Sequence, residues 1–266
     1  MDAKLGRVVI TGAAGRMGAT VRADLRVDAE HLVLVDQEAE TVEGETAVAA
    51  DVSDLDALVK AFEDADAVVH LAAVSDEAPL DTLLETNVQA TFNVLEAARR
   101  AEVRRVVLLS SDRVTGGYPI HHHVFPDEPP RPDGLCGVSN VAVEALGQMY
   151  ADTFGLEVVA LRAGSFKEEP TETRDLAVWL SPHDCAGFVR AALTASNVSY
   201  VVAYAVSANA RRFWDLTVAE NELGYRPEDD AAKFAGRFAD DDPFWHGGPQ
   251  GGDRATPEAV LKHLPD

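Results

Sequence analysis

The sequence predicts an α/β fold built on a doubly wound parallel sheet. Short apolar runs typical of strands alternate with amphipathic stretches typical of helices. A glycine-rich turn follows the first apolar run, and an aspartate ends the second. Continuous apolar strands indicate a sheet that is buried on both faces, and strands alternating with helices indicate parallel β–α–β connections.

The elements are expected in the following order. Strands are predicted at 7–10, 32–35, 47–49, 67–70, 106–109 and 158–161, with helices at 17–26, 54–63, 81–101 and 138–154 between them. After residue 163 the pattern loosens, with a helix near 182–195, a strand near 199–206 and a helix near 214–222. The tail from residue 239 is rich in Asp, Gly and Pro, so we expect it to be irregular. We therefore divide the chain into a sheet domain, 1–163, and a small capping lobe with its tail, 164–266, integrated with the first.

Composition excludes several classes of protein. A formal net charge of −22 over 266 residues argues against a nucleic-acid partner. No apolar run is long enough to span a bilayer, and the N-terminus lacks the regions of a signal peptide. The two cysteines, Cys136 and Cys185, provide no disulfide framework. We expect a cytoplasmic protein without a membrane partner.

The glycine-rich turn predicts a dinucleotide site. It runs Thr11-Gly12-Ala13-Ala14-Gly15-Arg16-Met17-Gly18 and opens a predicted helix. Glycines let the backbone turn tightly and approach a pyrophosphate, which then lies against the N–H groups of the helix N-terminus. Asp36, at the end of the next strand, can bind both ribose hydroxyls and favours NAD over NADP, because a 2′-phosphate would meet like charge. The alternative is a tight turn that binds no nucleotide.

Further motifs extend this pattern along the chain. They are Asp51-Val52, His70-Leu71-Ala72-Ala73, Asn87 and Ser110-Ser111, followed by segments 131–135, 137–139, 161–165, 207–209 and 223–227. In order and content they resemble the extended short-chain dehydrogenases/reductases, and most of all the uronate dehydrogenase branch. The resemblance covers nearly the whole chain. It implies a Rossmann-type domain and the oxidation of galacturonate or glucuronate by NAD at the anomeric carbon, giving an aldarolactone.

The resemblance also implies a role for each matching position. The cofactor-binding positions are Gly12, Gly15, Arg16, Met17, Gly18, Asp36, Asp51, Val52, Leu71, Ala72, Ala73, Asn87 and Ser110. Among these, Asp51 and Val52 would contact the adenine, residues 71–73 would lie beneath the nucleotide, and Asn87 would hold a structural water or a backbone carbonyl.

The substrate-binding positions implied by the resemblance are Ser75, Ser111, Arg113, Ser165 and Arg174. Arg174 would grip the uronate carboxylate with two parallel hydrogen bonds. Arg113 replaces a histidine of the uronate branch and would add positive charge to the cleft. The alternatives are a solvated loop arginine at 174 and a turn-capping pair of serines at 110–111.

The catalytic motif of the family is altered. Its tyrosine and the lysine one helical turn later are replaced by Cys136 and Asn140. In the family the phenol accepts the sugar proton, and the ammonium lowers the phenol's pKa and holds the nicotinamide ribose. Here Ser111 would polarise the reacting oxygen and Asn140 would bond the ribose. A thiol titrates at about 8.5, so Cys136, or a water beside it, could accept the proton. The alternative for Cys136 is a small buried filler.

The missing tyrosine and lysine leave more than one function open. The first hypothesis is an NAD-dependent dehydrogenase acting on a small sugar or sugar acid. Losing a positioned base costs on the order of 10²- to 10⁴-fold in rate. The alternative is therefore a catalytically silent homologue that binds NAD and a sugar acid, or an impaired variant of an active parent. An epimerase or dehydratase of the same superfamily would also need the tyrosine.

Three other features bear on the site and the assembly. Tyr118 is a conceivable substitute acid or base, although packing against its loop is the simpler expectation.

The histidines at 121–123 predict no metal site, because neighbouring side chains on an extended segment point to opposite sides. The long apolar helices at 81–101 and 138–154 correspond to those through which related enzymes pair, so we expect a dimer.

Overall fold

The computed structural model describes residues 5–38 and 40–264. The central sheet contains the parallel strands β1 (Leu5–Thr11), β2 (Ala29–Asp36), β3 (Glu45–Ala49), β4 (Ala67–His70), β5 (Arg105–Ser111), β6 (Glu157–Ala163) and β9 (Tyr200–Ala205). Their spatial order is β3-β2-β1-β4-β5-β6-β9. The chain builds outward from β1 to β3 and then crosses back to β4, so the sheet changes winding direction between β1 and β4. The predicted doubly wound fold is confirmed.

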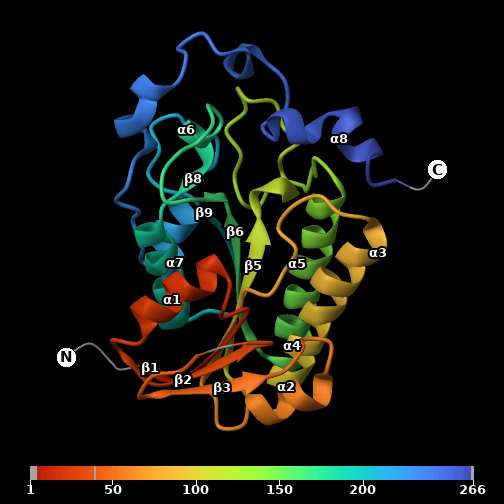
Figure 1. The fold of residues 1–266 in the computed structure, drawn as a ribbon, viewed down its shortest axis with the longest axis vertical. Helices are drawn as coiled ribbons and strands as arrows, with labels where there is room; N and C mark the ends of the chain where they lie inside the picture. Colours follow the sequence, from red (N-terminus) through yellow and green to blue (C-terminus); the bar gives the residue numbers. More distant parts are fainter. Residues whose placement is uncertain (1–4, 39, 265–266) are drawn as a thin grey trace.

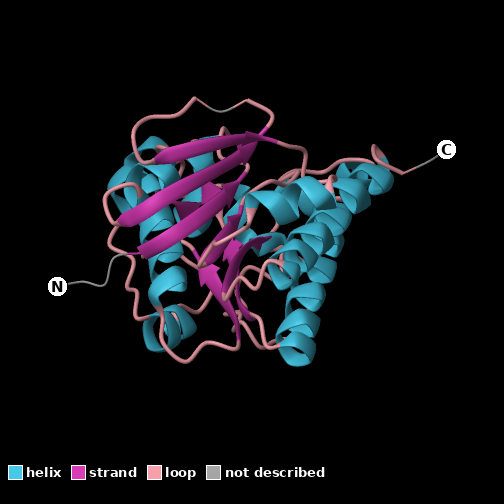
Figure 2. Ribbon diagram, turned by 90° about the horizontal axis from the view of Figure 1, so that it is seen from below, coloured by secondary structure: helices cyan, strands magenta, loops and turns pink. Residues whose placement is uncertain are grey.

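Helices cover both faces of this sheet (Figures 1 and 2). One face carries α1 (Arg16–Leu25) and α7 (Pro182–Thr194), and the other carries α2 (Leu55–Ala61), α4 (Ala90–Arg100) and α5 (Leu135–Phe154). The helix predicted at 81–101 consists of α3 (Leu80–Leu83), a wider π-helical stretch (Leu84–Gln89) and α4. Such π-helical stretches are rare and often lie near functional sites.

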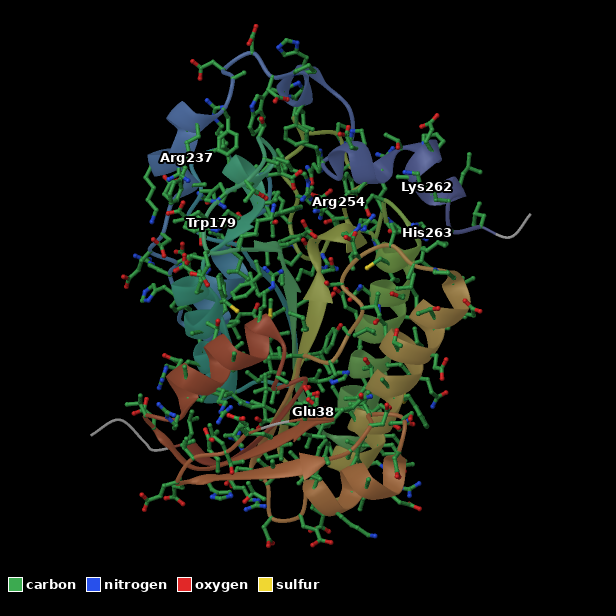
Figure 3. The ribbon with its side chains drawn as sticks, in the orientation of Figure 1. Glu38, Trp179, Arg237, Arg254, Lys262 and His263 are labelled. Atoms are coloured by element: carbon green, nitrogen blue, oxygen red, sulfur yellow. The ribbon has the colours of Figure 1, made fainter. Side chains whose placement is uncertain are left out.

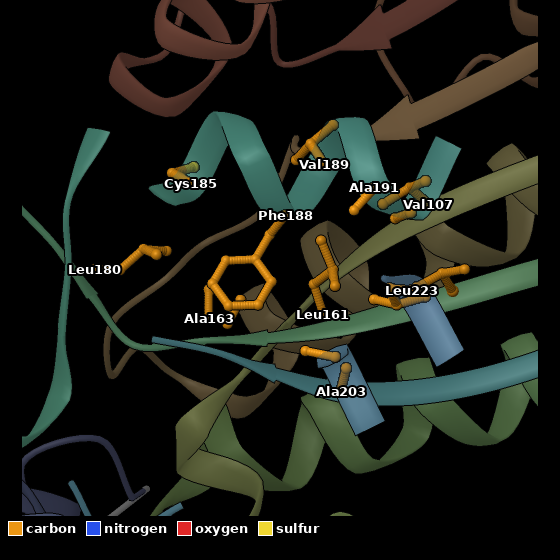
Figure 4. Close-up of a cluster of buried hydrophobic side chains, with 14 of the residues drawn as sticks. Val107, Leu161, Ala163, Leu180, Cys185, Phe188, Val189, Ala191, Ala203 and Leu223 are labelled. Atoms are coloured by element: carbon orange, nitrogen blue, oxygen red, sulfur yellow. The ribbon is translucent and has the colours of Figure 1, made fainter. Parts of the chain in front are cut away.

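Two hydrophobic cores form because neighbouring side chains of a strand face opposite ways. In β1, Ile10 packs with the helices of the α1/α7 face, whereas Val9 packs with those of the other face. Phe188 of α7 is fully buried among Leu161, Ala163 and neighbouring side chains (Figure 4). This two-sided burial explains the continuous apolar strands and holds their C-terminal ends at fixed positions.

The capping lobe contributes to the main sheet as well as covering it. A small sheet of β7 (Ser165–Phe166) and β8 (Trp179–Leu180) and the short helix α6 (Asp175–Val178) form the lobe, after which α7 and β9 return to the main sheet. The helix expected near 214–222 is a π-helical stretch at Ala219–Leu223. Among the described residues, no helix has the length and hydropathy that crossing a bilayer requires.

The C-terminal tail is more ordered than the sequence predicts. It contains short 3₁₀ turns at Pro243–His246 and Gly252–Ala255, followed by α8 (Pro257–Leu261), and a further 3₁₀ stretch at Ala231–Arg237 precedes it. Backbone bonds from Gly251 N–H to Gly116 O and from Gln250 N–H to Tyr118 O, both 2.8 Å, attach it to the loop after β5. The tail therefore passes over the end of the sheet at which β5 and β6 terminate (Figure 1).

His70, at the end of β4, should make stability depend on pH. Its ring nitrogens lie 2.7 Å from Thr11 Oγ1 and 3.3 Å from Thr91 Oγ1, and burial lowers the pKa of His70 from 6.5 to about 4. Below pH 6.5 only the unfolded chain takes up this proton, so the free energy of unfolding should fall until pH 4, by about 3 kcal/mol in total.

Urea unfolding of the parent and of His70→Gln at neutral and mildly acidic pH measures this contribution. The variant lacks the imidazole, so its stability should fall less steeply over the same pH interval. Equal slopes for the two proteins would contradict the assignment to His70.

Candidate nucleotide and substrate site

A cavity of about 360 Å³ lies at the C-terminal ends of the strands. Its walls come from the glycine turn after β1 and from the segments that follow β4, β5 and β6, with Asn140 of α5 and Arg254 of the tail. Ligands of doubly wound sheets bind at this edge, where the winding direction reverses. The cavity thus joins the predicted nucleotide turn to the predicted substrate side chains.

The glycine turn is packed too tightly for side chains. Gly12 has φ +73°, and a Cβ there would lie 2.7 Å from Ala72 N. A Cβ on Gly18 would lie 2.2 Å from Gly12 O. Gly15 caps α1, and Arg16 and Met17 begin the helix and line the cavity. The first N–H groups of a helix have no intrahelical acceptor, so this arrangement suits a bound phosphate.

The acidic end of β2 is attached to the same turn. Asp36 accepts hydrogen bonds from Ala14 N–H (2.9 Å) and Gln37 N–H (2.8 Å). Asp51 accepts from Ser53 N–H (2.8 Å) and Gln37 Nε2 (3.3 Å), and the Ser53 bond lowers the pKa of Asp51. The structure therefore brings Asp36 and Asp51 together around Gln37, beside the glycine turn.

The segment after β4 forms one wall of the cavity. Leu71, Ala73 and Ser75 line it, while Ala72 lies beneath Gly12. Asn87 secures this segment, since its Oδ1 accepts from Val74 N–H (2.8 Å) and its Nδ2 donates to Val74 O (3.0 Å). Asn87 thus holds a backbone carbonyl, one of the two partners expected for it.

The two serines at the end of β5 have different environments. The buried Ser110 hydroxyl donates to Glu144 Oε1 at 2.6 Å, so its proton is used inside the protein although the residue lines the cavity. Ser111 Oγ accepts from Arg113 N–H and donates to Asp112 Oδ1, both at 3.2 Å. Ser111 caps the turn that follows β5 and also lines the cavity.

Cys136 is not suited to the role of proton acceptor that the sequence suggested. Its residue surface is fully buried, and its Sγ lies 3.9 Å from Val74 O. Burial raises the pKa of Cys136 to about 12, so the thiol stays protonated at neutral pH. Asn140 lines the cavity, with Nδ2 donating to Cys136 O at 2.9 Å. The environment of Cys136 fits the alternative of a buried filler.

Neither arginine presents its charge to the cavity as expected. Arg113 lines the cavity, but its guanidinium lies 2.6 Å from Glu77, 2.9 Å from Asp133 and 3.6 Å from Asp76, so carboxylates neutralise it. Arg174 is buried, with Nη2 2.8 Å from Asp112 Oδ2 and Nε 2.7 Å from Gln250 O. The idea that Arg113 adds net positive charge is therefore wrong, and so is a solvated loop arginine at 174.

The structure adds cavity residues that sequence reasoning did not select. Asp76, Asp112, Lys167 and Arg254 all line it. Lys167 Nζ lies 2.7 Å from Asp175 Oδ2, and Arg254 extends from the tail above the end of β5 (Figure 3). Asp112 directly follows the end of β5, so the reasoning that selected Ser111 could also have selected Asp112. Arg254 was not, because nothing in the sequence indicates that the tail folds back over the sheet.

The remaining candidates take part in packing. Tyr118 OH donates to Pro129 O at 3.0 Å and its ring stacks on His122, as the packing alternative predicts. His122 and His123 lie beside Glu128 and Asp215. Within residues 5–38 and 40–264, His, Cys, Asp and Glu side chains form no group that could hold a metal ion.

Fold and site together define a dinucleotide-binding α/β protein whose glycine turn shares one cavity with polar side chains at the C-terminal ends of the strands. Residues 8–167 match the model of the NAD dependent epimerase/dehydratase family, and the chain belongs to this family.

The similar proteins include several sugar-oxidising enzymes. A uronate dehydrogenase of Pseudomonas syringae pv. tomato is 34% identical, over 89% of this chain and 89% of its own. An L-arabinose 1-dehydrogenase (NAD(P)(+)) of Haloferax volcanii is 38% identical, over 86% and 98%. A solved Agrobacterium tumefaciens uronate dehydrogenase, complexed with NAD after one tyrosine was changed to alanine, superposes with a TM-score of 0.87 at 34% identity, covering 93% of this chain and 96% of that one.

Proposed function

We propose that this chain is an NAD-dependent oxidoreductase that oxidises a sugar or sugar acid at its anomeric carbon, converting a uronate to an aldarolactone. The observation that carries the proposal is the single cavity that joins the glycine turn to the hydroxyls of Ser75, Ser111 and Ser165. The similarity to uronate and arabinose dehydrogenases supports the choice of substrate class. NAD, when bound, supplies the acceptor for the hydride.

The chain's residues would hold the nucleotide along the edge of the sheet. Gly12, Gly15, Arg16, Met17 and Gly18 would bind the pyrophosphate through backbone N–H groups and the α1 N-terminus. Asp36 would bind the adenosine ribose, Asp51 and Val52 the adenine, and Leu71, Ala72 and Ala73 the underside of the nucleotide. Asn87 would keep that floor in place, Ser110 would contact the nucleotide through its free lone pairs, and Asn140 would bond the nicotinamide ribose.

The sugar would lie in the polar end of the cavity. Ser75, Ser111 and Ser165 line this end and would bind its hydroxyl groups. Arg113 Nη1 and Arg174 Nη1 are buried atoms without a hydrogen-bond partner in the described part of the chain. Buried donors of this kind are normally satisfied, so a substrate carboxylate that reaches Arg113 in the cavity wall would complete its bonding. Arg174 is bound to Asp112 of the same wall and would act on the substrate from behind it.

A direct rate assay tests the proposal. Purified protein is mixed with NAD or NADP and with D-galacturonate, D-glucuronate or L-arabinose, and NADH formation is followed by absorbance. We expect sugar-dependent reduction with at least one substrate and a preference for NAD, because Asp36 repels a 2′-phosphate. Nucleotide binding without turnover, with activity gained by Cys136→Tyr plus Asn140→Lys, would instead favour a silent homologue.

We also propose that two copies pair through α3–α4 and α5. Large hydrophobic side chains are exposed on these helices, namely Leu80, Leu84, Phe92, Val138, Met149 and Phe154. Exposed apolar patches of this kind mark association sites. Sedimentation velocity should give a dimer for the parent and a monomer for Phe92→Glu plus Met149→Glu, and a monomeric parent would refute the pairing.

A further inference from the structure

The proposed reaction needs a proton acceptor that the altered motif does not supply. Oxidising an anomeric C–OH removes a hydride from carbon and a proton from oxygen. The Cys136 thiol is fully buried and protonated, and the Asn140 amide does not titrate in water. The Lys167 amino group is engaged by Asp175 at 2.7 Å and by Thr171 at 2.8 Å. The acceptor must therefore be another group beside the cavity.

Asp112 is placed to be that group. Its carboxylate lines the cavity with only 6% of the side chain exposed. Oδ1 accepts the Ser111 hydroxyl at 3.2 Å, while Oδ2 is bound by Arg174 Nη2 at 2.8 Å. The arginine thus fixes the carboxylate with one oxygen directed to Ser111.

The bonding of Ser111 leaves room for a substrate hydroxyl. A serine oxygen has one proton to donate and two lone pairs to accept with. The proton goes to Asp112, and one lone pair accepts Arg113 N–H at 3.2 Å. The second lone pair is left for a hydrogen-bond donor in the cavity. When Ser111 Oγ accepts a proton there, its own hydroxyl proton can pass to Asp112.

We propose that Asp112 is the terminal proton acceptor of the oxidation and that Ser111 relays the proton to it. This inference rests on the proposed function. The anomeric C–H bond breaks, and its electron pair leaves with the hydrogen as hydride to NAD⁺, the named oxidant. The carbon–oxygen bond becomes a carbonyl while the hydroxyl proton passes to Ser111 Oγ and the Ser111 proton passes to Asp112 Oδ1. Asp112 then releases its proton to solvent, so mass and charge balance.

The other nearby carboxylates lack this placement. Among the described residues that line the cavity, the acids are Asp76 and Asp112. Asp76 is 77% exposed and lies 3.6 Å from Arg113. Glu77 and Asp133 are bound by Arg113 at 2.6 and 2.9 Å. Of these four carboxylates, only Asp112 is buried, lines the cavity and accepts the Ser111 hydroxyl.

The pH dependence of the rate should carry the signature of a carboxylate. The charged or titratable groups that face Asp112 are Arg174, Asp133 and Cys136. A base of the phenol or thiol type loses activity below about pH 8, so a kcat that stays level between about pH 6 and about pH 9 would support the relay.

Variants of Asp112 test the inference directly. Asp112→Asn keeps the shape but removes the base, and we expect kcat with D-galacturonate, or with the best sugar of the panel, to fall on the order of 100-fold. Asp112→Ala should regain activity on addition of formate, a small carboxylate that can occupy the vacated space. Calorimetric titration should show NAD affinity within about twofold of the parent, which separates proton removal from nucleotide binding. Asp56→Asn, at an exposed carboxylate on α2 outside the cavity, is the matched control and should change kcat by less than about threefold.

Each outcome decides between the inference and its competitors. An Asp112→Asn enzyme with the parent's kcat and pH profile, or an Asp112→Ala enzyme that binds NAD but ignores formate, overturns the relay and leaves the proposed function standing. A parent that is inactive on every sugar, with activity gained by Cys136→Tyr plus Asn140→Lys, overturns the relay and indicates a silent homologue. Inactivity of both proteins contradicts the proposed function itself.

Discussion

Replacing Gly18 with valine is expected to reduce NAD affinity by more than about 10²-fold. A Cβ at this position would lie 2.2 Å from Gly12 O and 2.8 Å from Ala13 Cα, which are backbone atoms that cannot rotate aside. The turn would have to open, and the N–H groups at the start of α1 would move away from the pyrophosphate. Each charge-assisted hydrogen bond lost costs about 1.5–3 kcal/mol, so losing two or more accounts for the expected change.

Isothermal calorimetry with NAD measures the effect, and circular dichroism shows whether the variant is folded. Gly18→Ala introduces the same clash with a smaller side chain and should also weaken binding. Gly236→Ala is the matched control, because its Cβ would have no neighbour within 4 Å. A folded Gly18→Val protein that binds NAD within threefold of the parent would show that the turn does not hold the pyrophosphate.

Replacing Glu144 with leucine should lower the free energy of unfolding by about 3–5 kcal/mol. Glu144 binds the Nε and Nη2 atoms of Arg162 at 2.8 Å each and accepts the Ser110 hydroxyl at 2.6 Å. The Arg162 side chain is only 3% exposed and that of Glu144 only 9%. Removing the carboxylate leaves a buried guanidinium without a counter-charge, which is the main source of the loss.

Equilibrium unfolding in urea measures this loss. The double variant Glu144→Leu plus Arg162→Met should recover most of the stability, because no buried charge is left uncompensated. Arg237→Met removes an ion pair with Glu169 whose side chains are 53% and 55% exposed, and it should cost less than about 1 kcal/mol. If the Glu144 and Arg237 variants lose equal free energy of unfolding, the buried ion pair contributes no more to stability than the exposed one.

The main features of the fold were predictable because they follow from local patterns. The apolar run containing Val8, Val9 and Ile10 can only be a strand buried on both faces, and it is the inner strand β1. Gly18 is required by contacts within one β–α turn and Gly12 by its φ of +73° in that turn, and the motif itself encodes both. Asn87 holds Val74, only 13 residues away along the chain, and the resemblance was sufficient to identify this role.

The electrostatics of the site depend on contacts between distant segments and were not predictable. Arg174 is neutralised by Asp112, 62 residues away, and bound by the carbonyl of Gln250 in the tail. The acidity of Cys136 depends on its burial, which a sequence does not state. Cationic residues were therefore assigned to the substrate when the fold had already paired them with acids.

NAD binding at the glycine turn underlies every role proposed for the cavity. Calorimetric titration of NAD into the folded parent protein tests this directly. We predict a single class of site, one NAD per chain, with a dissociation constant in the micromolar range. Folded protein that gives no heat of binding at millimolar NAD would contradict the central claim.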